Sequence, residues 1–116
     1  MPDLSVRLGP EALSTPLVAA SGTVGSIVDF AGSIDFRAYG AAVAKSVAPE
    51  AWPGRPAPRI APVGDGMLNG IGIQNPGIEQ WIQDHEAELA RIPTRVWASA
   101  VGSDAAGFAV VAEALD

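Results

Sequence analysis

The sequence predicts an α/β domain with parallel strands, and three observations support this prediction. Stretches that favour strands alternate along the chain with stretches that favour helices, which is typical of parallel sheets with helical crossovers. The strand-like stretches at 16–22 and 40–47 are almost continuously apolar, as expected of strands that are covered on both faces. Hydrophobic residues make up 48% of the 116 residues and charged residues 17%, which excludes a disordered chain.

The first part of the chain is expected to hold a hairpin and then the two buried strands. Residues 4–8 alternate apolar and polar side chains, which indicates a half-buried strand. A Gly-Pro turn signal follows, and a short return strand near 12–14 would complete the hairpin. Between the two buried strands, residues 26–39 contain two weak helical pieces interrupted by a glycine.

The rest of the chain is expected to form a long loop, two helices and a third strand. The proline-rich stretch 49–62 predicts the loop, because proline lacks an N–H donor and restricts the residue before it. Residues 76–92 predict the clearest helix, with Asn75 as its cap and apolar residues at spacings of three and four. A strand over 95–101 and a helix over about 104–115 follow.

Charge and residue types exclude several classes of function. The net charge is −6 without a basic cluster, which argues against binding to nucleic-acid phosphates or to an anionic membrane surface. The chain has no cysteine, and neither a metal-ligand spacing nor a Ser-His-Asp arrangement is present. No apolar stretch reaches the roughly 18 residues of a membrane span, and the first residues do not resemble a signal peptide. A cytoplasmic protein is therefore expected.

Polar residues at the ends of the three strands are the first candidates for a binding site. Right-handed crossovers place the carboxyl ends of parallel strands on one face, where α/β proteins bind ligands. The polar residues there are Ser21, Lys45 with Ser46, and Ser99. Lys45 is the only lysine, and a buried cation at this place favours an anionic or polar ligand. The alternative is a side chain that lies just past the buried part of the strand and extends into solvent.

A segment rich in glycine and asparagine, residues 66–77, is the second candidate. Glycines let the backbone approach a ligand closely, and asparagines offer donors and an acceptor to an amide-like substrate. The segment lacks the spacing of a phosphate-binding loop. The alternative is a tight turn in which the asparagines satisfy backbone groups. In the helix that follows, Trp81 and His85 lie on the apolar face and are expected to pack in the core.

Several short segments occur in one order and spacing that resembles a known family. They are LSVRLG at 4–9, ASGT at 20–23, AKSV at 44–47, PE at 49–50, PG at 53–54 and MLNGIGIQNPG at 67–77. Together they resemble the N-terminal part of the catalytic subunit of class 1 dihydroorotate dehydrogenases, most closely the NAD-linked class 1B branch. The resemblance implies an FMN-dependent (β/α)₈ TIM barrel that oxidises dihydroorotate to orotate in pyrimidine synthesis. Residues 1–116 would supply its N-terminal hairpin and about three of the eight βα units.

The resemblance also implies roles for individual residues. Ser21, Lys45, Ser46 and Ser99 match FMN-binding positions, although the family often has asparagine in place of Ser99. Lys45 also matches a lysine that reaches the substrate. The residues that match the loop receiving the orotate ring and carboxylate are Asn69, Gly70, Ile71, Gly72 and Ile73. The family's base is a cysteine on a later loop, so no catalytic residue is expected before Asp116, and no turnover is expected from these residues alone.

The class 1B resemblance further implies a homodimer and an iron–sulfur, FAD-bearing subunit that passes electrons to NAD. Two other interpretations stay open. One is another flavin barrel that acts on a pyrimidine, such as that of dihydropyrimidine dehydrogenase. The other is a non-enzymatic α/β module that binds a partner through its open sheet edge or its proline-rich loop.

Overall fold

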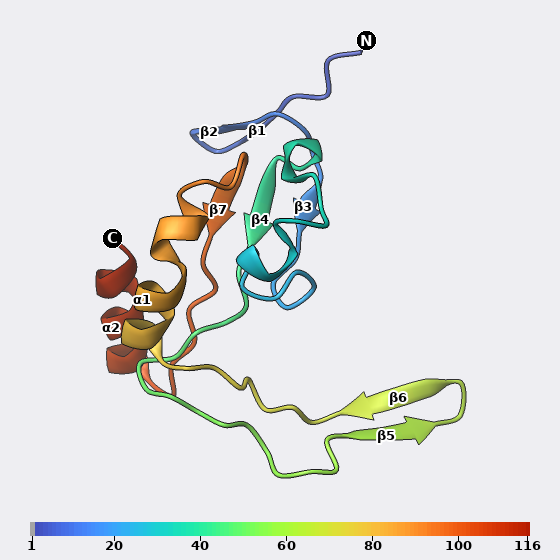
Figure 1. The fold of residues 1–116 in the computed structure, drawn as a ribbon, viewed down its shortest axis with the longest axis vertical. Helices are drawn as coiled ribbons and strands as arrows, with labels where there is room; N and C mark the ends of the chain where they lie inside the picture. The colour runs from blue at the N-terminus through green and yellow to red at the C-terminus, as the bar shows by residue number, and fades with distance from the viewer. Residues whose placement is uncertain (1) are drawn as a thin grey trace. The chain divides into compact units, whose positions relative to one another are not determined.

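The structure, a computed structural model, describes residues 2–116 (Figure 1). The chain forms two compact units. The first unit runs as far as Ser46 and also includes Ile82–Ser99. The second unit consists of Val47–Trp81 and Ala100–Asp116.

A three-stranded parallel sheet in the order β3-β4-β7 is the centre of the first unit. β3 is Val18–Ala19, β4 is Ala41–Val43 and β7 is Arg95–Trp97. Ala41 and Ala42 of the central strand are fully buried. The nearly continuous apolar pattern of this stretch therefore reflects a strand covered on both faces, and the parallel α/β prediction is confirmed.

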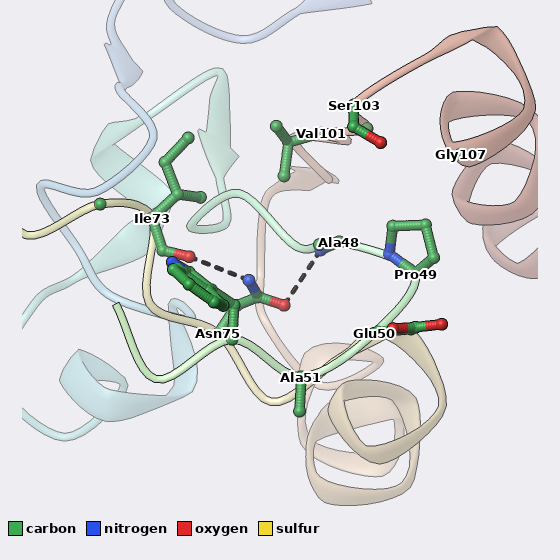
Figure 2. Close-up of a pocket in the computed structure, with 12 residues that line it drawn as sticks. Ala48, Pro49, Glu50, Ala51, Ile73, Asn75, Val101, Ser103 and Gly107 are labelled. Atoms are coloured by element: carbon green, nitrogen blue, oxygen red, sulfur yellow. Dashed lines mark hydrogen bonds between the residues drawn. The ribbon is translucent and has the colours of Figure 1, made fainter. Parts of the chain in front are cut away.

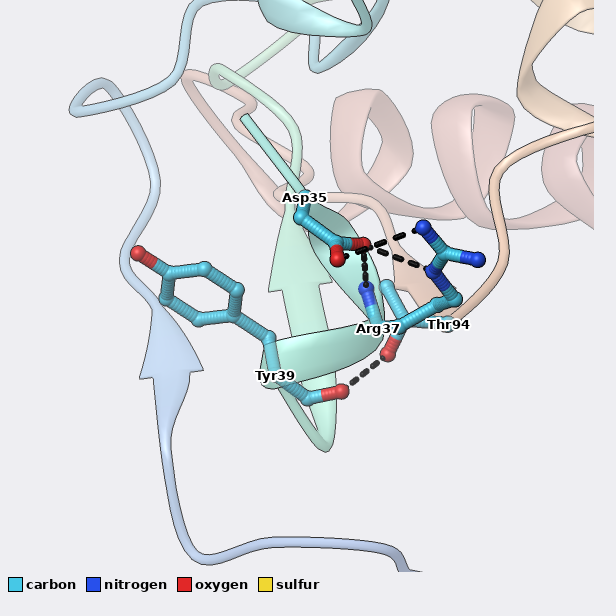
Figure 3. Close-up of polar contacts among 4 residues, drawn as sticks. All are labelled: Asp35, Arg37, Tyr39 and Thr94. Atoms are coloured by element: carbon cyan, nitrogen blue, oxygen red, sulfur yellow. Dashed lines mark hydrogen bonds and ion pairs between the residues drawn. The ribbon is translucent and has the colours of Figure 1, made fainter. Parts of the chain in front are cut away.

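Polar contacts just before β4 and β7 hold these two strands in register (Figure 3). The Thr94 hydroxyl donates to the carbonyl oxygen of Tyr39 over 2.7 Å and so joins the starts of both strands.

Upstream of β4, the Asp35 carboxylate accepts from the backbone N–H and the Nε of Arg37, at 3.1 and 2.8 Å. The Arg37 side-chain bond, followed by the backbone bond, lowers the pKa of Asp35 below its ordinary value.

The predicted N-terminal hairpin is confirmed, and the two helical pieces are shorter than expected. β1 (Val6–Leu8) pairs antiparallel with β2 (Glu11–Leu13). Between β3 and β4 the chain forms only two short 3₁₀ turns, Val28–Phe30 and Phe36–Ala38. Phe36 is buried in the core of this unit.

The second unit contains an antiparallel hairpin that the sequence did not predict. It consists of β5 (Ile60–Val63) and β6 (Gly66–Asn69), drawn in yellow-green in Figure 1. The expectation of a loop throughout 49–62 is therefore wrong for its last three residues. Pro62 is tolerated in β5 because each strand of a two-stranded hairpin has a free edge, where the missing N–H costs no ladder bond.

Both predicted helices are present, as α1 (Ile78–Leu89) and α2 (Ala105–Leu115). The Asp104 side chain caps α2 by accepting the N–H of Gly107 over 2.8 Å. α1 begins two residues later than predicted, because Gly77 has a φ of 85° and lies outside the helix. Trp81 is buried, as expected. Neither helix in this part of the chain is long and apolar enough to cross a membrane.

Candidate functional site

The ends of β4 and β7 bring together two of the predicted flavin-binding residues, Ser46 and Ser99. Their hydroxyl oxygens are 2.8 Å apart and share one hydrogen bond. Both residues are half-buried. Because one hydroxyl donates to the other, the acceptor keeps its own O–H, which can be directed at a ligand. The prediction that polar residues at the ends of the parallel strands lie close together is therefore confirmed for Ser46 and Ser99.

Ser21 and Lys45 are tied to the same strand end by backbone contacts. The Ser21 hydroxyl donates to the carbonyl oxygen of Ala44 over 2.9 Å. The backbone N–H of Lys45 donates to the carbonyl oxygen of Gly25 over 2.9 Å. Lys45 is half-buried, and within residues 2–116 its ammonium group makes no ion pair or hydrogen bond. A half-buried cation of this kind is suited to an anionic or polar ligand.

A strained residue lies in the loop that supports Lys45. The Val28 N–H donates to the Ser26 carbonyl over 2.8 Å, and Ile27 between them has φ 69° and ψ −53°, which makes a γ-turn of the rare hand. Such a backbone conformation costs about 1–3 kcal/mol. Ile27 is fully buried, so packing holds it in place. No pattern in the sequence predicts this turn, because isoleucine disfavours a positive φ.

In the second unit, the segment 69–73 follows β6 and is held at its start and middle by backbone hydrogen bonds. The Gly70 N–H donates to the carbonyl oxygen of Arg59 over 2.8 Å. The carbonyl oxygen of Ile71 accepts from the Arg55 N–H over 3.0 Å. The proline-rich stretch, which supplies both arginines, therefore shapes the predicted substrate loop.

The same segment presents hydrogen-bond donors that have no acceptor within the described chain. The Asn69 side-chain oxygen accepts the Ile71 N–H over 2.9 Å, as the tight-turn alternative predicted, but the Asn69 NH₂ group stays free. The N–H groups of Gly72 and Ile73 also have no acceptor among residues 2–116. These donors suit a ligand that carries carbonyl or carboxylate oxygens.

Asn75, expected as a helix cap and as one of the asparagines of residues 66–77, joins three backbone segments of the second unit, two of which are drawn in Figure 2. Its Oδ1 accepts from the N–H groups of Ala48 and Gly77, at 3.1 and 3.0 Å. Its Nδ2 donates to the carbonyl oxygen of Ile73 over 2.9 Å. Its backbone also exchanges two hydrogen bonds with Trp52, each 2.9 Å long. The sequence signal for this role is the alternative in which the asparagines of residues 66–77 satisfy backbone groups.

A pocket of about 580 Å³ lies beside Asn75 within the second unit (Figure 2). Pro49, Trp52 and Val101 form part of its apolar wall, and Glu50 and Ser103 add polar groups. In residues 2–116, no group of three or more His, Cys, Asp or Glu side chains is placed to hold a metal ion. The strand ends and the glycine-rich segment offer hydroxyls, amide groups and the Lys45 ammonium to a ligand.

A family model described as dihydroorotate dehydrogenase matches residues 3–116. The chain belongs to the dihydroorotate dehydrogenase family. The family resemblance in the sequence is therefore confirmed. At 18% identity, a DHODH from Eimeria tenella in complex with ferulenol has a TM-score of 0.59, covering 86% of this chain and 28% of that chain. The ligand-free form has a TM-score of 0.55, covering 90% and 32%. This likeness supports the α/β fold.

Curated relatives share the name dihydroorotate dehydrogenase B (NAD(+)), catalytic subunit. The relative from Alkaliphilus oremlandii is 38% identical over 113 residues, which are 97% of this chain and 37% of the relative. The relative from Pelobacter propionicus is 40% identical over 115 residues, which are 99% of this chain and 38% of the relative. The chain therefore spans less than two fifths of the length of these dihydroorotate dehydrogenases.

Proposed function

We propose that the protein to which this chain belongs is an FMN-dependent, NAD-linked dihydroorotate dehydrogenase that oxidises dihydroorotate to orotate in pyrimidine synthesis. The observation that carries the proposal is the match to the family over residues 3–116. We further propose that residues 1–116 are part of an FMN-binding (β/α)₈ barrel, to which they contribute the hairpin and the strands β3, β4 and β7. Family membership argues against the two other interpretations of the sequence.

The residues of the first unit fit a flavin at the carboxyl ends of its strands. Dihydroorotate dehydrogenases depend on a flavin, and the flavin proposed here is FMN. When bound, it would supply the hydride acceptor. The pair of Ser46 and Ser99 keeps one O–H that can donate to its ring edge, and the Ser21 oxygen, whose O–H is donated to Ala44, can accept from it. The unpaired Lys45 ammonium would stabilise the negative charge that develops there during reduction.

The donors of the second unit fit the substrate that the proposal requires. Orotate is planar and carries a carboxylate and ring carbonyl oxygens, all of which accept hydrogen bonds. The free Asn69 NH₂ and the N–H groups of Gly72 and Ile73 would bind these oxygens. Gly70 and Ile71 would shape the loop through their bonds to the proline-rich stretch. The family resemblance assigns Lys45 a second role towards the substrate, which stays a prediction.

Partners and location complete the proposal. The relatives are named as catalytic subunits, which implies that they work with another subunit. For this protein we propose an iron–sulfur, FAD-bearing subunit that passes electrons to NAD, a homodimer of the catalytic chain, and a place in the cytoplasm. The negative net charge supports the absence of nucleic-acid and membrane partners.

The test is to purify the protein from its complete reading frame and measure its flavin and its turnover. We expect one FMN per chain and formation of orotate from dihydroorotate with an artificial electron acceptor. Lys45→Ala should lower flavin content or flavin reduction, whereas Arg91→Ala, at an exposed residue outside the proposed site, should not. Protein that contains no flavin and forms no orotate would refute the proposal. Turnover by residues 1–116 alone would contradict the expected need for a later catalytic base.

A further inference from the structure

We infer that Asn75 is a positioning residue that holds the Gly72 and Ile73 N–H groups in the conformation that binds substrate. This inference rests on the proposed function, because it concerns the loop to which substrate binding is assigned. Asn75 itself touches no substrate in this scheme. It acts through the carbonyl group of Ile73.

The first support is that both ends of the Asn75 amide are in use. Oδ1 accepts the backbone N–H of Ala48, and Nδ2 donates to the Ile73 carbonyl oxygen (Figure 2). Oδ1 also accepts the N–H of Gly77. The side chain thus connects the loop after β4, the turn before α1 and the end of the glycine-rich segment. An amide is the side chain that combines this acceptor and this donor at such a short reach.

The second support is the strained backbone of Ile73. Its φ of 57° is in the left-handed region, which a β-branched residue disfavours. Ile27, the other isoleucine with a positive φ, is fully buried and is held by packing. Ile73 is 47% exposed, so packing alone does not hold it. Among the described residues, the Asn75 bond to its carbonyl oxygen is the one hydrogen bond that Ile73 makes, and it opposes relaxation of this residue.

The third support is where the strained residue lies. The N–H groups of Gly72 and Ile73 are the two backbone donors of the segment 69–73 that have no acceptor within the described chain. The direction of the Ile73 N–H depends on the φ of Ile73 and the ψ of Gly72, and the adjacent Gly72 N–H shifts when the backbone of this turn changes. Relaxation of Ile73 would redirect these donors, while the bonds of Gly70 and Ile71 to the proline-rich stretch could persist. The effect of losing the Asn75 bond should therefore be concentrated on ligand binding.

The test compares Asn75→Asp with the wild type in the flavin-loaded protein from the complete reading frame. The aspartate keeps the oxygen acceptors, but it removes the Nδ2 donor and places a carboxylate against the Ile73 carbonyl. We expect the KM for dihydroorotate and the Kd for orotate to rise at least fivefold, with less than a twofold change in kcat and in flavin content. Gln83→Glu makes the same amide-to-acid change at an exposed position of α1 and should change none of these values. KM and Kd within twofold of wild type would overturn the inference.

Ile73→Gly provides a second, independent measurement. Glycine adopts a positive φ without strain. The factor by which Asn75→Asp raises the KM should therefore be at least threefold smaller in the Ile73→Gly background than in the wild type. An equal fold-rise in KM on Asn75→Asp in both backgrounds would overturn the inference. If Asn75→Asp fails to fold alone but folds with Ile73→Gly, the inference is supported; if neither folds, it is wrong. A wild-type protein that neither binds orotate nor oxidises dihydroorotate would refute the proposed function instead.

Discussion

Replacing Gly54 by alanine tests how strongly the proline-rich stretch shapes the predicted substrate loop. Gly54 is buried and has a φ of 78°. A Cβ atom at this position would overlap the carbonyl oxygen of Ile71 and lie 3.2 Å from the Cβ of Gln74. The Ile71 carbonyl is the group that accepts the Arg55 N–H, so the substitution forces apart two segments that a hydrogen bond now joins.

Three effects set the expected cost of Gly54→Ala. A left-handed backbone costs a residue with a Cβ about 1–2 kcal/mol. Loss of the bond between Arg55 and Ile71 adds about 1 kcal/mol. Displacement of a packed backbone segment typically adds about 1–3 kcal/mol. We therefore expect the free energy of unfolding to fall by about 3–6 kcal/mol.

Urea unfolding of the protein from its complete reading frame measures this loss, and Gly64→Ala is the matched control. Gly64 has a φ of 56°, but a Cβ there would meet no atom within 4 Å. The control should cost only the backbone term, about 1–2 kcal/mol. Gly54→Ala should also weaken orotate binding, whereas Gly64→Ala should not. Equal losses of stability in the two variants would show that the contact with the Ile71 carbonyl contributes nothing.

Three further predictions concern charge and hydrogen bonding. Lys45→Ala should slow flavin reduction by dihydroorotate in stopped-flow absorbance, and normal reduction with normal flavin content would contradict the role of this cation. Asn69→Ala should weaken orotate binding roughly 10- to 100-fold, the worth of one hydrogen bond to a charged group, as measured by flavin absorbance titration. Asp35 has a lowered pKa, so the stability gained from its contacts with Arg37 is present above the ordinary carboxyl pKa and is lost as the pH falls below it. Asp35→Asn should remove the part of the pH dependence of unfolding that comes from this carboxyl group. If the variant and the wild type lose stability equally between about pH 5 and 2, Asp35 makes no such contribution.

The sequence predicted the elements in which a short-range pattern and the final environment agree. β4 is nearly all apolar because both of its faces are buried, and this pattern is visible in one dimension. Asp104 caps α2 with the geometry that its residue type favours. The contact between Ser46 and Ser99 also followed, because residues after neighbouring parallel strands meet at one edge.

The sequence failed where distant backbone groups decide the local conformation. Residues 60–62 form part of a strand although Pro62 and the proline-rich stretch before it favour a loop, because β6 pairs with them. α1 starts at Ile78 because Gly77 turns away from the helix, with its N–H bound to Asn75. Ile27 adopts a γ-turn that its own side chain disfavours, and burial together with backbone hydrogen bonds to Val24 and Phe30 holds it there.

The sequence by itself thus determined the parallel α/β fold, the family and the strand ends at which the proposed flavin-binding residues lie. These depend on the order of residue types along the chain, which hydrophobic periodicity and motif spacing record directly. The tertiary structure decided which donors of the glycine-rich segment stay free, which backbone residues are strained, and that Asn75 joins three segments. These properties depend on hydrogen-bond partners as far as 27 residues apart, and no local pattern specifies such pairs.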